Sequence, residues 1–222
     1  MRLKLFTFLV LFGFALAPIS LFAQTAEISP YGGYVWPNDF TGIGDFKGNQ
    51  ILGVRGGGYV TDHFEIGGNY NWNNHFQPRN ANPAASLAGS LGFPQGAVRA
   101  NLWEAEFTYN FGKHNLLGSS VRPYVVLGGG GLTARIKNED EFVFNVRAVR
   151  PNGNGTIFVP NDVLESGDTF FTFSYGGGVK TARLWGPMGV FGDFRGRTVP
   201  NFFGHANTWP ELSAGLHFSW GE

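Results

Sequence analysis

The sequence of 222 residues has no cysteine and few charged residues, and these absences exclude several classes of protein. Without cysteine the chain has neither a disulfide framework nor a thiolate metal site. Its 16 Lys and Arg residues are balanced by 16 Asp and Glu residues, so it lacks the excess positive charge that is typical of nucleic-acid binding. Charged residues make up 14% of the chain, against roughly 25% in an ordinary soluble domain. Such a composition does not suit a surface covered by water.

Long apolar runs are also scarce, and the one that is present lies at the N-terminus. Arg2 and Lys4 precede a nearly continuous apolar stretch, Pro18 interrupts it, and a small residue follows. This order is typical of a secretory signal peptide. A retained membrane anchor is the alternative, although the interruption comes before the roughly 20 residues that span a bilayer. We therefore expect residues 1–23 to be a signal peptide and residues 24–222 to form one domain.

Apolar and polar residues alternate along the rest of the chain. In residues 64–73 one set of alternate positions is mainly aromatic or aliphatic, and the other is mostly Asn with one Glu. Residues 102–111 and 211–220 repeat this period of two, which places alternate side chains on opposite faces of a β-strand. Five further segments follow the pattern less purely: 26–36, 51–60, 121–134, 168–181 and 188–199. The sequence therefore predicts eight strands.

The sequence does not decide which side chains of residues 121–134 face outward. Val125 and Leu127 compete with Tyr124 and Val126 for the apolar face of that strand. Alternation therefore identifies the strand without deciding which side chains it turns outward.

The predicted connections alternate in length. Short ones fall at 61–63, 112–120 and 182–187, and long ones at 37–50, 74–98, 135–167 and 200–209. This asymmetry is typical of outer-membrane barrels, which have short periplasmic turns and long extracellular loops. We predict an all-β fold, an eight-stranded antiparallel up-and-down transmembrane β-barrel. The loop at 135–167 is expected to project as a hairpin beyond the membrane, and the loop at 74–98, which has no strand pattern, is expected to be mobile.

The polar face carries too few charges to be a hydrated exterior. A lipocalin-type barrel would turn its apolar face inward around a ligand and would need that hydrated exterior. Six acidic and four basic residues on the polar face would instead neutralise one another inside a narrow lumen. Aromatic residues near the strand ends favour the same orientation, because lipid-facing barrels have aromatic girdles at both membrane interfaces. The expected interior polar network comprises Glu27, Arg55, Glu65, Glu104, Glu106, Lys180, Asp193, Arg195, Arg197 and Glu211.

Glycine and aromatic usage in several strands resembles that of a known family. The segments Pro30–Tyr34, Gly53–Tyr59, Pro123–Gly131 and Leu212–Trp220 are similar to the small bacterial outer-membrane β-barrel domains related to OmpA and OmpX. The resemblance implies an eight-stranded barrel with a polar interior in the outer membrane of a Gram-negative cell envelope. It also implies insertion by the barrel-assembly machinery, for which Trp220 would supply the terminal aromatic. We expect no peptidoglycan-binding domain.

The leading functional hypothesis is a non-enzymatic outer-membrane barrel, an envelope scaffold whose surface loops make external contacts. Its expected partners are outer-membrane lipids and lipopolysaccharide, with an extracellular partner that the sequence does not identify. A narrow, porin-like channel for small or hydrophobic solutes is one alternative. A lipid-modifying enzyme is the other, with Ser213 and His217 on one strand face as its candidate pair. No cofactor is expected, and the acidic stretch Asn138–Glu141 matches no calcium-binding loop.

Overall fold

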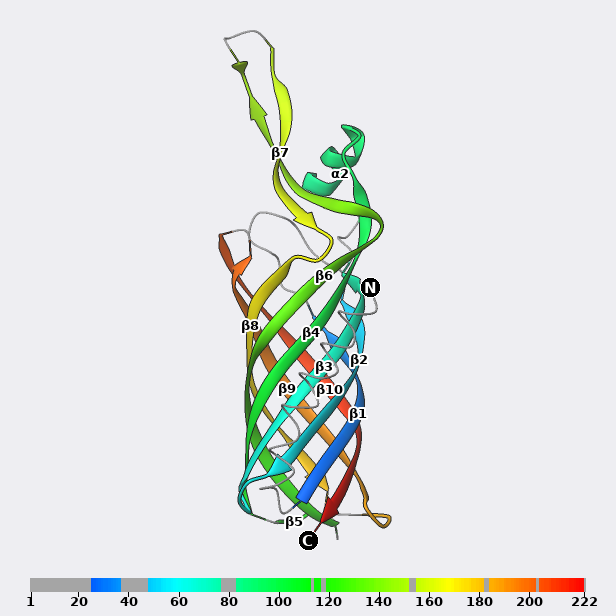
Figure 1. Ribbon diagram of the computed structural model, residues 1–222, viewed down its shortest axis with the longest axis vertical. Helices are drawn as coiled ribbons and strands as arrows, with labels where there is room; N and C mark the ends of the chain where they lie inside the picture. The colour runs from blue at the N-terminus through cyan, green and yellow to red at the C-terminus, as the bar shows by residue number, and fades with distance from the viewer. Residues whose placement is uncertain are drawn as a thin grey trace, which may run out of the picture.

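The computed structural model shows a single β-barrel with a projecting hairpin (Figure 1). The predicted signal peptide lies outside the residues that the structure describes. The described residues are 25–36, 48–76, 83–112, 114–116, 119–151, 155–181, 184–202 and 204–221.

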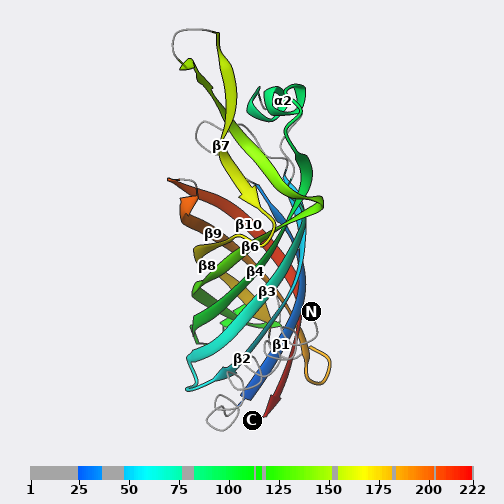
Figure 2. The same ribbon diagram turned by 45° about the horizontal axis from the view of Figure 1, so that its top comes forward.

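Eight antiparallel strands close the barrel, as predicted. Each strand pairs with its neighbours in the order β4-β3-β2-β1-β10-β9-β8-β6, and a further pairing between β4 and β6 closes the ring. Figure 2 shows the strands tilting around the barrel axis. The strands are β1 (Thr25–Val35), β2 (Asn49–Tyr59), β3 (Phe64–Phe76), β4 (Gln95–Asn110), β6 (Ser119–Val149), β8 (Thr169–Thr181), β9 (Met188–Phe202) and β10 (His205–Gly221).

The two ends of the barrel differ. At one end, which we call the turn end, β2 joins β3 through residues 60–63, and the first residue of β1 pairs with the last residue of β10. At the other, which we call the loop end, the hairpin and the helix α2 (Pro83–Ser90) extend beyond the barrel (Figure 1). Within the described part of the chain, no helix is both long enough and apolar enough to cross a membrane.

The predicted hairpin in the loop at 135–167 is confirmed. Strand β6 continues to Val149, well past the barrel, and pairs there with β7 (Ile157–Glu165). The pairing begins at Glu141 opposite Glu165 and ends at Val149 opposite Ile157. One strand of 31 residues therefore belongs both to the barrel wall and to the projecting hairpin.

The other two long loops that can be checked differ from expectation. The predicted long loop at 200–209 is wrong, because β9 and β10 continue through it. Asn201 caps the tight turn by accepting a hydrogen bond of 2.9 Å from the amide of Gly204, whose φ of 82° suits glycine. The hydroxyls of Thr198 and Thr208 also bond across the pair at 2.8 Å.

The loop at 74–98, for which the sequence predicts no strand pattern, has regular structure in its described part. It contains α2 and the first residues of β4. Pro83 is the first residue of this helix, where its missing amide costs nothing, and the alanines and leucine that follow favour helix. A period of two cannot reveal a short helix, so a search for strands passes over it.

The outer surface of the barrel is apolar around its whole circumference. Among the outward-facing residues, Leu52 is 62% exposed, Phe107 60%, Leu127 64% and Phe171 62%. The facing of β6 is now resolved, since Leu127 points outward and its neighbour Val126 is buried. A monomer in water rarely exposes a contiguous apolar patch beyond about 300–600 Å², so this belt faces hydrocarbon.

Candidate functional site

The lumen holds all ten charged residues of the predicted interior polar network. They occupy inward-facing positions on seven of the eight barrel strands, and all are buried except Glu65, whose side chain is 14% exposed. Their ion pairs form three groups. A middle group contains Arg55, Glu106, Asp193 and Arg195, a second contains Glu104, Arg197 and Glu211, and a third contains Glu27, Glu65 and Lys180.

Asp193 is the centre of the middle group. Its carboxylate lies 2.6 Å from the guanidinium of Arg55 on β2 and 3.0 Å from that of Arg195 on its own strand. The hydroxyl of Tyr124 donates to it at 3.0 Å, and Ser213 donates a further hydrogen bond. These four donors come from β2, β6, β9 and β10, so one carboxylate ties together opposite walls of the barrel.

Arg195 connects this carboxylate to a second one. Its guanidinium makes an ion pair with Glu106 on β4 as well as with Asp193. Both partners and Arg195 itself are buried. Removal of this one guanidinium would leave Glu106 without its ion-pair partner, and Asp193 would keep only Arg55. Both carboxylates would then be poorly paired in a region of low dielectric.

The second group lies farther toward the loop end. Arg197 makes ion pairs with Glu104 at 2.5 Å and with Glu211 at 3.1 Å, and the hydroxyl of Ser174 donates to Glu104 at 3.2 Å. Arg197 is 1% exposed and Glu211 is also 1% exposed. One arginine thus bridges β4, β9 and β10.

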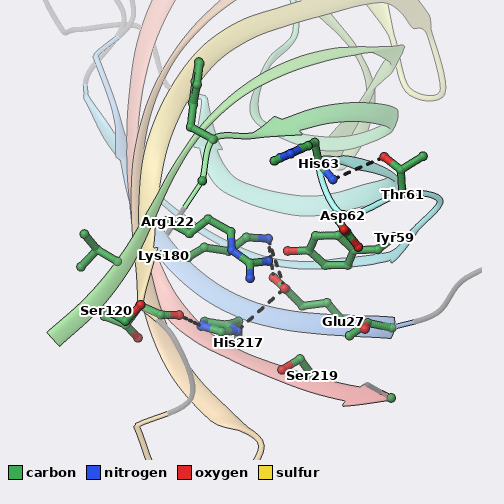
Figure 3. A pocket seen from close by; sticks show the side chains of 16 residues that line it. Glu27, Tyr59, Thr61, Asp62, His63, Ser120, Arg122, Lys180, His217 and Ser219 are labelled. Atoms are coloured by element: carbon green, nitrogen blue, oxygen red, sulfur yellow. Dashed lines mark hydrogen bonds and ion pairs between the residues drawn. The ribbon is translucent and has the colours of Figure 1, made fainter. Parts of the chain in front are cut away.

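The third group lies nearest the turn end. The ammonium of Lys180 lies 3.1 Å from Glu27 and 2.9 Å from Glu65. Figure 3 shows Lys180, Glu27 and His217 pointing toward one another. His217 Nδ1 is 3.8 Å from Glu27, and its Nε2 bonds the carbonyl of Thr181 at 2.9 Å. Since a carbonyl only accepts, Nε2 carries a proton and Nδ1 faces the carboxylate.

A glycine opposite the network makes room for its side chains. Gly178 on β8 pairs with Asp193 on β9. A Cβ at Gly178 would lie 2.5 Å from the Cβ of Asp193 and 2.8 Å from the ring of Tyr124. Because real Cβ atoms do not approach that closely, only glycine lets the Tyr124–Asp193 hydrogen bond form beside this strand.

The loop-end part of the lumen is apolar, and this corrects the expectation of a polar interior throughout. We call this region the apolar plug. Its members are buried, inward-facing residues from six barrel strands together with two residues at the base of the β6–β7 hairpin. They are Val35, Ile51, Val98, Ala100, Leu102, Leu132, Ala134, Ile136, Phe142, Leu164, Val199, Phe202 and Trp209.

A sequence signal for the apolar plug was present but short. Val98, Ala100 and Leu102 share a face with Glu104 and Glu106, and the predicted strand started only at residue 102. The polar character of that strand face therefore ends at Glu104. Extending the alternation four residues toward the N-terminus would have shown it.

The free space in the lumen is concentrated at the turn end. A cavity of about 670 Å³ opens there beside Glu27, Tyr59 and Lys180. Farther in, a much smaller space of about 30 Å³ is bounded by Arg55, Glu106 and other network residues.

Ser213 and His217 do not form a catalytic pair in the described structure. The hydroxyl of Ser213 donates to Asp193 and also accepts a hydrogen bond of 2.8 Å from Arg55. His217 is engaged with Thr181 and faces Glu27. The two side chains are committed to different groups of the network.

No family model matches the sequence, and a search of curated proteins finds none that is similar to it. Solved structures are similar in fold. Neisserial surface protein A matches with a TM-score of 0.52 at 14% identity, covering 88% of this chain and 97% of that one. The outer membrane protein OprG from Pseudomonas aeruginosa matches with a TM-score of 0.51 at 9% identity, covering 90% and 97%. The N-terminal β-barrel domain of Pseudomonas aeruginosa OprF matches with a TM-score of 0.50 at 14% identity, covering 89% and 98%.

The predicted resemblance to small outer-membrane barrels is confirmed at the level of the fold. A closed barrel with this fold and an apolar outer belt is a protein of the bacterial outer membrane. In barrels of this kind short turns lie on the periplasmic side and long loops outside, so we expect the turn end to face the periplasm and the loop end to face the outside.

Proposed function

We propose that the protein is a non-enzymatic envelope scaffold that holds its loop-end hairpin outside the cell for external contacts. The observation that carries this proposal is the filling of the lumen by two different means in series. The buried ion pairs occupy its middle, and the apolar plug follows toward the loop end. A lumen filled twice supports a structural role better than a transport role.

The filled lumen argues against the channel hypothesis. Interior positions of eight-stranded barrels are generally filled by side chains, so an aqueous path requires some of them to move. Here such a path would have to break the pairs of Arg195 and Arg197 and also displace Trp209, which is 3% exposed. The cavity at the turn end is lined by Glu27 and Lys180 of the network.

Conductance across a planar bilayer tests this choice. The folded wild type should give no stepwise conductance. Neither Arg197→Ala nor Trp209→Ala alone should open a path, because the apolar plug remains in the first variant and the ion-pair network remains in the second. The combination Arg197→Ala with Trp209→Ala weakens both fillings, and it is the variant in which brief openings are expected first. Regular conductance steps from the wild type would favour the channel and contradict the scaffold.

The absence of enzyme activity is a separate part of the proposal. The partners of Ser213 and His217 support it, since neither side chain is free to act as nucleophile or base for the other. Purified protein incubated with lipopolysaccharide should leave the mass spectrum of the lipid unchanged. A mass change that disappears in Ser213→Ala and His217→Ala would overturn this part.

Proteolysis of intact cells tests whether the hairpin is presented outside. Arg147 on β6 and Arg150, which follows it, are exposed in the hairpin. Trypsin added to intact cells should therefore cut the chain after Arg147, because the bond from Arg150 to Pro151 resists trypsin, and Arg147→Gln should remove that cut. Cleavage that occurs only after the outer membrane is opened would contradict the proposed orientation.

A further inference from the structure

Three cations lie together on the outer face of the barrel near the loop end. Arg99 on β4 and Arg135 on β6 are direct cross-strand partners, and Lys137 is two residues beyond Arg135 on the same face. All three side chains are exposed. Directly opposed Cβ atoms in an antiparallel pair are about 4.5–5.5 Å apart, and diagonal neighbours about 7–8 Å. We call these three residues the basic triplet.

No ion pair among the described residues neutralises the basic triplet. Within the described residues, none of its three side chains has an ion-pair partner. Like charges directly opposite one another destabilise a pair of strands. The arrangement contrasts with the lumen, where all four cations of the network have carboxylate partners. An anion from outside the chain would relieve the repulsion.

The position of the triplet indicates which anion is available. Trp103, on the same outward face of β4, is 46% exposed, and Trp72, opposite Asn101, is 41% exposed. Such rings mark the membrane interface. Arg99 is four residues from Trp103 toward the loop end, a distance of roughly 13 Å along the strand. Because strands in such barrels are inclined to the barrel axis by about 35–45°, this corresponds to roughly 10 Å along the axis. The triplet therefore lies at the level of the outer-leaflet headgroups.

The triplet is confined to one side of the barrel. Near the loop end, the described outward-facing residues of the other barrel strands are uncharged, and the exposed acidic residues Asp140, Glu141 and Glu165 belong to the hairpin. The uncharged residues include Tyr34 on β1, Gln50 on β2, Thr169 on β8, Pro200 on β9 and Thr208 on β10. A general attraction to anionic headgroups would not require such a concentration, so the β4–β6 seam is a local site.

We propose that the basic triplet binds the phosphate groups of lipopolysaccharide, the phosphorylated glycolipid of the outer leaflet. The forked guanidinium groups of Arg99 and Arg135 suit the oxygens of one phosphate, and Lys137 adds a third charge beside them. This site is independent of the scaffold proposal, since it needs only a barrel that spans the membrane. It assigns the β4–β6 seam as the lipid-binding side of the protein.

Thermal unfolding of the folded protein in detergent tests the site. The transition is measured alone, with lipopolysaccharide, with the same glycolipid after enzymatic removal of its phosphates, and with inorganic phosphate at equal phosphate concentration. The test variant is Arg99→Gln with Arg135→Gln, and Arg147→Gln in the hairpin is the control for loss of an exposed arginine. Heat-modifiable migration on a gel checks that each variant is folded.

The proposal predicts opposite effects with and without the glycolipid. Without it, the double variant should unfold at the same temperature as the wild type or higher, because the repulsion is gone. With lipopolysaccharide, the wild type and Arg147→Gln should be stabilised, and the double variant should need a roughly tenfold higher concentration for the same shift, because two charge-assisted contacts are lost. Equal shifts for the double variant and the wild type, or equal shifts with the dephosphorylated glycolipid, would overturn the proposal. A wild-type shift with inorganic phosphate as large as that with the glycolipid would show an anion site that does not select the lipid, and would overturn it as well.

Discussion

The middle and the loop end of the lumen exclude water by different chemistry. In the middle, buried carboxylates and guanidinium groups fill the space, and every charge must meet its partner. At the loop end, the apolar plug fills a similar cross-section with side chains that need only fit by volume. The comparison teaches that a closed barrel has two solutions to the same problem, one demanding in geometry and one demanding in packing.

The largest effect should come from breaking the middle of the network. Arg195→Met keeps the side-chain length but leaves Glu106 without its partner and Asp193 with one partner fewer. Loss of one member of a buried ion pair costs about 3–5 kcal/mol. The free energy of unfolding, measured by urea titration of the protein in lipid vesicles, should fall by that amount.

The control for this variant removes an arginine that has no buried partner. Arg147→Met in the exposed hairpin should change the free energy of unfolding by less than about 0.5 kcal/mol. Similar losses for Arg195→Met and Arg147→Met would mean that the network contributes little to stability.

A smaller loss is expected from the apolar plug. Leu102 is 1% exposed in the lumen, so Leu102→Ala should leave a cavity and cost about 3 kcal/mol. Leu127→Ala is the matched control, because Leu127 is 64% exposed on the lipid-facing side and acyl chains can close around the smaller residue. Its cost should be about 1–2 kcal/mol in the same vesicle titration. A control as costly as Leu102→Ala would show that the plug is loosely packed.

The sequence predicts the positions of the strands better than it predicts the contacts between their charged residues. A period of two predicts the strands because each has one face toward lipid, and it does so best for residues 64–73 and 211–220. It says which charged residues share a face, but not which of them meet. Arg55 and Asp193 are 138 residues apart and approach only because the strands tilt around a closed barrel. That geometry depends on the register of all the pairings together.

The sequence pattern fails to predict the apolar plug for a different reason. The predicted strands end where the alternation of the lipid-facing segment stops, whereas the strands in the structure continue beyond that segment. There the outer face becomes polar, as at Arg99 and Arg135, while the inner face becomes apolar, as at Val98 and Ile136. The pattern therefore inverts along the same strands, and an apolar face no longer marks the outside.

Among the three test variants, the smallest loss should come where the network meets the turn-end cavity. This variant tests whether access of water decides the cost of an unpaired charge. Lys180→Met removes the cation shared by Glu27 and Glu65, which resembles the change in Arg195→Met. Glu27 and Lys180 line a cavity of about 670 Å³ that water can enter, whereas Glu106 does not line it and borders the smaller space of about 30 Å³. Because water can hydrate the released charges, we expect a loss of about 1–2 kcal/mol in the vesicle titration, below the full cost of a broken buried pair. A loss equal to that of Arg195→Met would mean that burial of the pair matters more than its distance from the cavity.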